Sequence, residues 1–276
     1  SKSIDIDDKI LAIIPILDKL EKDTTLREPV LGMVDKLVQS HPNDIKAITA
    51  KADVLYNINK KEEAFDYYKK AIEINPDSLP GTVWIQTYIL AAELEKNDEL
   101  ISITEKGIKY DKDDAFGYFY NAIGHQQKKQ YVEAAKSAKN GISIAEKASI
   151  NNYNKQLKLQ MLIILGDVSY ELKEYAQMDS AYEAALEIDP NNPTLLNNYA
   201  YYLSERNIDF EKAERMSKKS NLLQDGNAAF VDTYAWIMYK MKNYKEALKW
   251  IEEAMSIPGA TERALWRNFV YTKQKR

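Results

Sequence analysis

Hydrophobic and small residues recur every three or four positions along most of this chain, with charged residues between them. That spacing places the apolar side chains on one side of an α-helix. Five segments show the pattern most clearly, at residues 60–78, 130–147, 174–192, 209–227 and 243–260. No segment alternates apolar and polar residues over a convincing strand length, so the pattern predicts an all-α protein.

The helical segments repeat at a fixed distance. A small residue falls late in each of them, and a weaker sixth copy at 97–115 has one at the matching place: Ala71, Gly107, Gly141, Ala185, Ser220 and Ala254. Successive members of this column are 36, 34, 44, 35 and 34 residues apart. A period close to 34 residues indicates a repeat array, in which each unit packs mainly on its neighbours.

A second predicted helix precedes these segments and has its own small residue, at Ala52, Ala122, Gly166, Ala200 and Ala235. Small residues at matched places allow two helices to approach closely. Aromatic residues mark the start of the later helix in four units: Tyr131, Tyr175, Phe210 and Tyr244. Prolines, which cannot continue a helix, then end it, at Pro42, Pro76, Pro190 and Pro258. Each unit is therefore predicted to be a helical hairpin.

The 34-residue period, the two helices per unit, the paired small residues and the closing proline resemble the tetratricopeptide repeat (TPR). The resemblance covers six units within residues 45–261: 45–78, 81–114, 115–148, 159–192, 193–227 and 228–261. It implies a right-handed superhelical solenoid of antiparallel helix pairs. Residues 1–44 are expected to form a degenerate N-terminal capping unit, whose first helix Pro15 would shorten. Residues 262–276 are expected to form a C-terminal capping helix or a truncated repeat, with Leu265, Trp266 and Val270 covering the last unit.

Two units depart from the pattern. Unit 81–114 has Tyr88 where a small residue belongs. About ten extra residues, 147–156, follow unit 115–148, and we expect them to form a lengthened helix or a loop.

Composition narrows the possible functions. A formal net charge of −4 argues against nucleic-acid binding, which usually requires a basic stripe. The chain has no cysteine, which excludes disulfides and thiolate chemistry. The longest apolar run, Ile10 to Leu17, has eight residues. A bilayer-spanning helix needs about twenty, so no transmembrane segment is predicted in this sequence.

Few residues are suited to catalysis. The chain has two histidines. His41 stands beside Pro42 at a predicted helix end, and His125 is expected to line the groove or lie on the surface. No zinc-protease, dinucleotide-binding, nucleotide-phosphate or serine-nucleophile motif occurs. The sequence therefore predicts no catalytic residues, no cofactor and no metal site.

The TPR resemblance implies that the first helix of every unit lines a concave groove. Reading those helices turn by turn predicts a partner-binding groove formed by Asp53, Tyr56, Ile89, Phe116, Phe119, Tyr120, Ile123, Asp167, Tyr170, Asn197, Tyr201, Asp232, Trp236 and Tyr239. Over all groove positions, six acids (Asp53, Glu93, Asp167, Glu171, Glu205 and Asp232) stand against two bases (Lys46 and Lys240). Aromatic anchors and negative charge favour a basic, partly apolar partner.

The sequence thus predicts a non-enzymatic scaffold that binds a peptide or protein segment. One alternative is a helical module that binds a carbohydrate or another small ligand. A closed pocket of a few hundred Å³ would favour this alternative. Another is self-assembly into a homo-oligomer through the terminal repeats. Residues 192–255 also look like the C-terminal part of bacterial TPR proteins, many of them envelope lipoproteins. This likeness favours the periplasmic side of a bacterial envelope over the cytoplasm.

Overall fold

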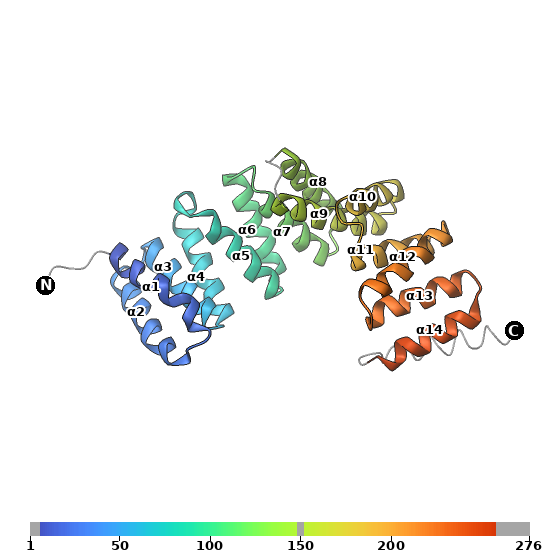
Figure 1. The fold of residues 1–276 in the computed structure, drawn as a ribbon. Coiled ribbons are helices and arrows are strands. Elements are labelled where there is room, and N and C mark those ends of the chain that lie inside the picture. Colours follow the sequence, from blue (N-terminus) through green and yellow to red (C-terminus); the bar gives the residue numbers. More distant parts are fainter. Residues whose placement is uncertain (1–5, 148–151, 258–276) are drawn as a thin grey trace. The chain divides into compact units, whose positions relative to one another are not determined.

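A computed structural model describes residues 6–147 and 152–257 (Figure 1). Within these ranges the chain forms fourteen α-helices and two short 3-10 helices, with no strand, which confirms the predicted all-α class. The chain divides into two compact units, residues 1–150 and 151–276, which are described separately below.

Unit 1 contains α1 to α8. Their bounds are Ile6–Leu20 (α1), Arg27–Ser40 (α2), Ile45–Asn57 (α3), Lys61–Ile74 (α4), Gly81–Glu93 (α5), Asn97–Tyr110 (α6), Ala115–Gln127 (α7) and Tyr131–Lys147 (α8), with 3-10 helices at Thr24–Leu26 (η1) and Pro76–Ser78 (η2). From α3 onward, consecutive helices pack in pairs as hairpins. The first two helices do not form such a hairpin, because α1 packs mainly on α3 and only slightly on α2.

Unit 2 contains three further hairpins. Its helices are Asn152–Glu171 (α9), Tyr175–Ile188 (α10), Pro193–Glu205 (α11), Phe210–Leu223 (α12), Ala228–Lys240 (α13) and Tyr244–Ser256 (α14). Polar side chains cap two of its first helices: Asn192 accepts from the Leu195 amide, and Asn227 accepts from the amides of Ala229 and Phe230. Such caps satisfy N–H groups that have no partner inside the helix.

Every hairpin from α3–α4 to α13–α14 turns through the same backbone motif. The residue that follows the first helix and its C-cap has a positive φ in all six: Asn59, Glu95, Lys129, Lys173, Asn207 and Lys242. In the first hairpin the amide of Lys60 donates to Leu55 O and that of Asn59 to Tyr56 O, each at 2.9 Å, and the other five repeat this pair. This is the Schellman motif, which usually has glycine at the positive-φ position.

Several helices begin and end at the residues that the sequence predicts. The predicted aromatic residues Tyr131, Tyr175, Phe210 and Tyr244 are the first residues of α8, α10, α12 and α14. α2, α4 and α10 end two residues before Pro42, Pro76 and Pro190. Pro258 and the predicted C-terminal cap with Leu265, Trp266 and Val270 lie outside the described residues.

Small residues do permit close helix contacts. Ala52, Ala122, Ala200 and Ala235 are fully buried. A Cβ atom on Gly166 of α9 would stand 2.6 Å from a ring carbon of Tyr182 on α10. The α5–α6 hairpin reverses this arrangement, because the large Tyr88 is on the first helix and Gly107 on the second makes room for it.

The structure corrects the prediction for Pro15 and adds detail to the prediction for the extra residues 147–156. Pro15 does not shorten the first helix: α1 runs through it from Ile6 to Leu20. One missing N–H is tolerated there because Ile13 and Leu20, on either side of it, are anchored in a core cluster with Val30, Val34 and Val54. Of the extra residues after unit 115–148, Lys147 ends α8 and residues 152–156 form the start of α9, so these helices have 17 and 20 residues; residues 148–151 lie outside the described ranges.

Candidate functional site

All fourteen predicted groove residues lie on the first helices of hairpins, seven in each unit. Unit 1 holds Asp53 and Tyr56 on α3, Ile89 on α5, and Phe116, Phe119, Tyr120 and Ile123 on α7; unit 2 holds Asp167 and Tyr170 on α9, Asn197 and Tyr201 on α11, and Asp232, Trp236 and Tyr239 on α13. Tyr201 is exposed (38%) and Asn197 is buried (7%), whereas the other twelve are half-buried.

In unit 1 the predicted residues form a mainly apolar surface. Phe119 meets Tyr120 edge-on at 5.0 Å between ring centroids, and Phe116 stacks on Tyr120 at 6.5 Å. Tyr120 also contacts the buried Tyr88 at 6.0 Å. This aromatic cluster is therefore anchored to the core of unit 1.

Asp53 and Asp167 occupy equivalent places in two hairpins and have equivalent partners. Asp53 accepts a hydrogen bond from the Tyr68 hydroxyl on α4, and Asp167 accepts one from the Tyr182 hydroxyl on α10. Burial raises the pKa of both carboxyl groups above the ordinary aspartate value, although the tyrosine donors oppose the shift. The sequence predicts groove-lining charges here; in the structure each carboxylate also links the two helices of its own hairpin.

Tyrosine rings run in contact from α10 across α9 to α11 in unit 2. Tyr170 lies 6.2 Å from Tyr175 and 4.2 Å from Tyr202 between ring centroids. Tyr202 in turn meets Tyr201 at 5.7 Å, and its hydroxyl donates to Asp167 at 3.2 Å. The exposed Tyr201 thus contacts the half-buried ring of Tyr202, which is in turn held by Tyr170 and by the carboxylate of Asp167.

Glu205 connects this cluster to the next hairpin. Its Oε1 accepts the indole N–H of Trp236 at 2.7 Å and lies 3.6 Å from the Lys240 ammonium. Tyr239 stacks on Trp236 at 5.4 Å, and the Lys240 ammonium lies 5.4 Å from the indole centroid. These contacts fix the positions of Trp236 and Glu205 relative to each other. We call Tyr170, Tyr201, Tyr202, Glu205, Trp236 and Tyr239 the unit 2 tyrosine surface.

Carboxylates surround this surface. Burial raises the pKa of Tyr170 and of Tyr201, and the charges of Glu205 and Glu171 raise both further. The charge of Asp232 also acts on Tyr201. The charges of three acids from three helices therefore act on Tyr201, and two of them also act on Tyr170. One of the three, Glu205, is paired with Lys240. Such a surface offers flat aromatic contact area in a negative potential.

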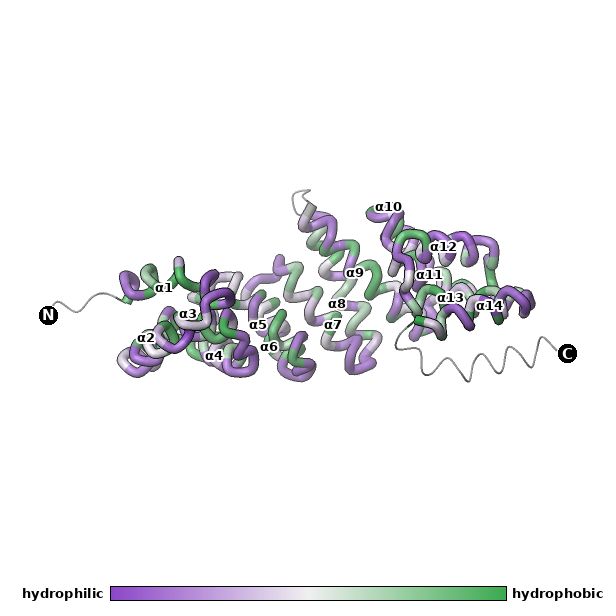
Figure 2. Tube along the Cα trace, turned by 60° about the horizontal axis from the view of Figure 1, so that its bottom comes forward, coloured by the Kyte–Doolittle hydropathy of each residue, from purple (hydrophilic) through white to green (hydrophobic). Residues whose placement is uncertain are grey.

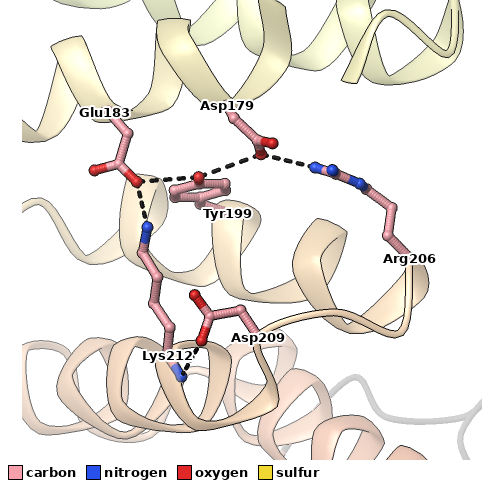
Figure 3. Close-up of polar contacts among 6 residues, drawn as sticks. All are labelled: Asp179, Glu183, Tyr199, Arg206, Asp209 and Lys212. Carbon is pink, nitrogen blue, oxygen red and sulfur yellow. Dashed lines mark hydrogen bonds and ion pairs between the residues drawn. The ribbon is translucent and has the colours of Figure 1, made fainter. Parts of the chain in front are cut away.

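A network of hydrogen bonds and ion pairs links α11 to α10 and α12 (Figure 3). The Tyr199 hydroxyl lies 3.2 Å from Asp179 Oδ1 and 3.1 Å from Glu183 Oε1, both on α10. Arg206 pairs with Asp179 at 2.7 Å, and Lys212 pairs with Glu183. The ring of Tyr199 also stacks on that of Tyr182 at 4.9 Å. Because the network ties α11 to the preceding hairpin, it orients Tyr201, Tyr202 and Glu205.

The predicted groove residues include neither Tyr202, which belongs to the unit 2 tyrosine surface, nor Tyr175, which contacts Tyr170 of that surface. Tyr175 starts α10 and also lies 4.6 Å beneath the Arg206 guanidinium. Tyr202 follows the predicted groove residue Tyr201 directly in the sequence. The run of tyrosines at 199, 201 and 202 is the signal that could have revealed it.

The second histidine is placed differently from its prediction. His125 is buried near the C-terminal end of α7, and its Nδ1 lies 2.7 Å from the side-chain oxygen of Gln130. It stabilises the α7–α8 turn and does not line a surface. Among the described residues, no three His, Asp or Glu side chains are grouped to hold a metal ion. None of the described helices combines the length and apolarity needed to cross a membrane.

The comparisons with known proteins agree on the repeat. A family model described as Tetratricopeptide repeat matches residues 45–78 and 159–192, and a second with the same description matches residues 181–215. The TPR repeat-containing protein PA4667 of Pseudomonas aeruginosa is 24% identical over 225 residues. That match covers 80% of this chain but only 30% of the relative, so the chain spans less than a third of its length.

Solved structures show the same fold at low sequence identity. PilF of Pseudomonas aeruginosa has a TM-score of 0.62 at 16% identity, over 81% of this chain and 96% of that one. A tetratricopeptide repeat protein from Parabacteroides merdae has a TM-score of 0.60 at 10% identity, over 98% and 100%. YrrB has a TM-score of 0.55 at 17% identity, over 73% and 97%. Residues 45–78 and 159–215 therefore match tetratricopeptide repeats, and the chain shares its fold with solved tetratricopeptide-repeat proteins.

Proposed function

We propose that this protein is a non-enzymatic scaffold that binds a peptide or protein segment along the first helices of its hairpins. The unit 2 tyrosine surface is the principal contact, and its ligand is a basic, partly apolar segment. The observation that carries the proposal is that Glu205 accepts the indole N–H of Trp236 while its charge, with those of Glu171 and Asp232, acts on the exposed Tyr201.

The chemistry of the surface supports a peptide of this kind. Tyrosine and tryptophan bury large areas at little cost in side-chain entropy, and they dominate the energetics of many interfaces. The nearby carboxylates attract lysine or arginine and repel acidic partners. YrrB, which shares the fold, is described as a TPR protein with an unusual peptide-binding site.

The carbohydrate alternative is less well supported. Two cavities, of about 410 and 450 Å³, lie on either side of α1 in unit 1. Their lining is mostly aliphatic and contains no aromatic ring on which a sugar could stack. One of them includes the predicted groove residue Asp53, but the aromatic residues of the predicted site line neither.

Selection from a random peptide library tests the proposal without knowledge of the natural partner. We expect the selected peptides to be enriched in arginine or lysine together with leucine or aromatic residues. Binding should be weakened by Tyr201→Ala and preserved by Tyr153→Ala, which removes a more exposed tyrosine (56%) from the same unit. Enrichment of acidic peptides, or equal binding by both variants, would contradict the proposal.

A further inference from the structure

Lys240, the last residue of α13, contacts two members of the unit 2 tyrosine surface. Its ammonium group lies 3.6 Å from Glu205 Oε1 and 5.4 Å from the centroid of the Trp236 indole. The side chains of Lys240 and Glu205 are only 19% and 26% exposed. A cation of this chain therefore lies where a basic ligand would find both a carboxylate and an aromatic face.

Three cations elsewhere in the described residues also lie against both an aromatic ring and a carboxylate: Lys51 with Tyr67 and Asp35, Arg206 with Tyr175 and Asp179, and Lys212 with Tyr199 and Glu183. Their distances to the ring centroids are 4.4, 4.6 and 4.7 Å. The first two lie 2.6 and 2.7 Å from their carboxylates, and the third is hydrogen-bonded to its own. Lys240 is farther from its ring, and 3.6 Å exceeds hydrogen-bond length. It is therefore the least tightly held of the four.

Glu205 keeps capacity for a further donor. Its Oε1 accepts the indole N–H of Trp236 at 2.7 Å and is also the atom that lies nearest the Lys240 ammonium. No side chain of the described residues donates to its Oε2. A carboxylate accepts several hydrogen bonds when ionised. A donor from a ligand can therefore bind Glu205 while the bond to Trp236 is kept.

A guanidinium group suits this place better than an ammonium group. It is planar, it stacks on aromatic faces, and its N–H groups have fixed directions, whereas an ammonium is a compact and strongly hydrated charge. A guanidinium stacked on Trp236 can donate to Glu205 at the same time. Both of these interactions are stronger for arginine than for the lysine that occupies the place in the free protein.

We propose that Lys240 is an intramolecular competitor of the ligand, and that an arginine of the bound segment displaces its ammonium from Trp236 and Glu205. The surface then selects arginine over lysine, because only the stronger cation gains by the exchange. This inference rests on the proposed function. It adds the ligand residue that the surface recognises and the residue of this chain that sets the affinity.

The displaced lysine has a favourable place to go. Lys240 is at the C-terminal end of α13, where the helix dipole favours a cation. The turn that follows, between α13 and α14, is mainly hydrophilic (Figure 2). The flexible stem of lysine can therefore carry the ammonium into solvent without moving the helix.

Substitutions at position 240 test the proposal with an arginine-containing peptide from the library. Lys240→Met keeps an apolar stem of similar length and removes the competing charge, so it should raise the affinity about fivefold or more. Lys240→Arg should lower the affinity, because a guanidinium holds the place more firmly. The order of affinity, Met above Lys above Arg, should persist at high salt because contacts between partly buried groups are little screened.

Lys242→Met is the matched control, since Lys242 is exposed in the same turn and carries the same charge. It should raise the affinity only at low salt, where long-range repulsion of a basic ligand acts. Circular dichroism should show all variants folded. Equal affinities across the position 240 series, or a gain in Lys240→Met that fades with salt as in the control, would overturn this inference. Peptide binding would then still support the proposed function, which fails only if no basic peptide binds.

A small probe tests the place without any peptide. N-acetyl-arginine amide should shift the NMR signal of the Trp236 indole N–H, which Trp236→Phe identifies among the four tryptophans. The shift should saturate at a lower concentration in Lys240→Met than in the wild type, and N-acetyl-lysine amide should bind more weakly. A Trp236 signal that the arginine amide leaves unmoved in Lys240→Met would overturn the inference, whatever the peptide library yields.

Discussion

Tyr88 of α5 and Gly107 of α6 share one space between their helices. A Cβ atom on Gly107 would stand only 1.8 Å from the Tyr88 hydroxyl oxygen and 3.1 Å from the ring carbon that bears it. In the α9–α10 hairpin the glycine, Gly166, is instead on the first helix and the tyrosine, Tyr182, on the second. Both hairpins therefore contain a close tyrosine–glycine contact, but the tyrosine lies on the first helix in one and on the second helix in the other.

Gly107→Ala is expected to destabilise unit 1 by about 1–3 kcal/mol, because the buried ring of Tyr88 must move. Gly32→Ala in α2 is the matched control. Nothing lies within 4 Å of a Cβ atom there, so that change should stabilise by about 0.5–1 kcal/mol through helix propensity. Urea unfolding of both variants measures the difference. Removal of the clashing hydroxyl by Tyr88→Phe should recover part of the loss, and equal stability of both glycine variants would show that the space is not shared.

The hairpin turns predict a second stability effect. Lys129 and Lys173 hold positive φ angles of 58° and 61°, which glycine adopts without cost. Lys129→Gly and Lys173→Gly should each stabilise by about 0.5–1 kcal/mol, and roughly additively because they lie in separate hairpins. Lys173→Ala keeps the Cβ atom and should give no such gain. Denaturant midpoints that fall for the glycine variants would contradict the assigned turn geometry.

The buried carboxyl of Asp167 predicts a pH dependence. Its pKa is raised in the folded protein, chiefly by burial, so the folded state holds this proton more tightly than the unfolded state. The resulting stabilisation is present below the unfolded pKa, about 4, and is lost as the pH rises through the folded value. Asp167→Asn removes the titration.

Thermal or chemical unfolding between pH 4 and pH 7 measures this effect. The stability of Asp167→Asn relative to the wild type should increase as the pH rises, and Asp53→Asn should show the same trend because burial also raises the pKa of Asp53. A constant difference across this range would show that neither carboxyl resists ionisation in the folded state.

Sequence periodicity predicted the repeat because the constraint is local. A helix that must approach another helix needs a small residue once per repeat, and a proline commonly ends a helix, although α1 continues through Pro15. The hairpin turns escaped prediction for a local reason too: Asn59, Glu95, Lys129, Lys173, Asn207 and Lys242 adopt a conformation that glycine or, more weakly, asparagine signals, and four of the six are neither. Hydrogen bonds to Leu55 O and its equivalents offset the unfavourable backbone angle.

The candidate site shows where reading one helix at a time is insufficient. The exposed Tyr201 and the half-buried Trp236 lie on the first helices, where the resemblance placed them. The burial of Asp53 and Asp167 depends on tyrosines fifteen residues later, Tyr68 and Tyr182, which lie opposite only after the hairpin closes. Pairings between helices of this kind are fixed by packing, which a single periodic pattern does not contain.

The most direct measurement of the central claim is the affinity of a selected basic peptide at low and high salt. Trp236→Ala should weaken binding by about 2 kcal/mol or more at both salt concentrations, since an aromatic anchor acts through burial. Glu171→Gln should weaken it mainly at low salt, because charges more than about 10 Å apart are screened at 0.1 M. Phe119→Ala, in the apolar surface of unit 1, is the control and should change the affinity little. Loss of binding in Phe119→Ala with full affinity in Trp236→Ala would contradict the account and place the ligand on unit 1.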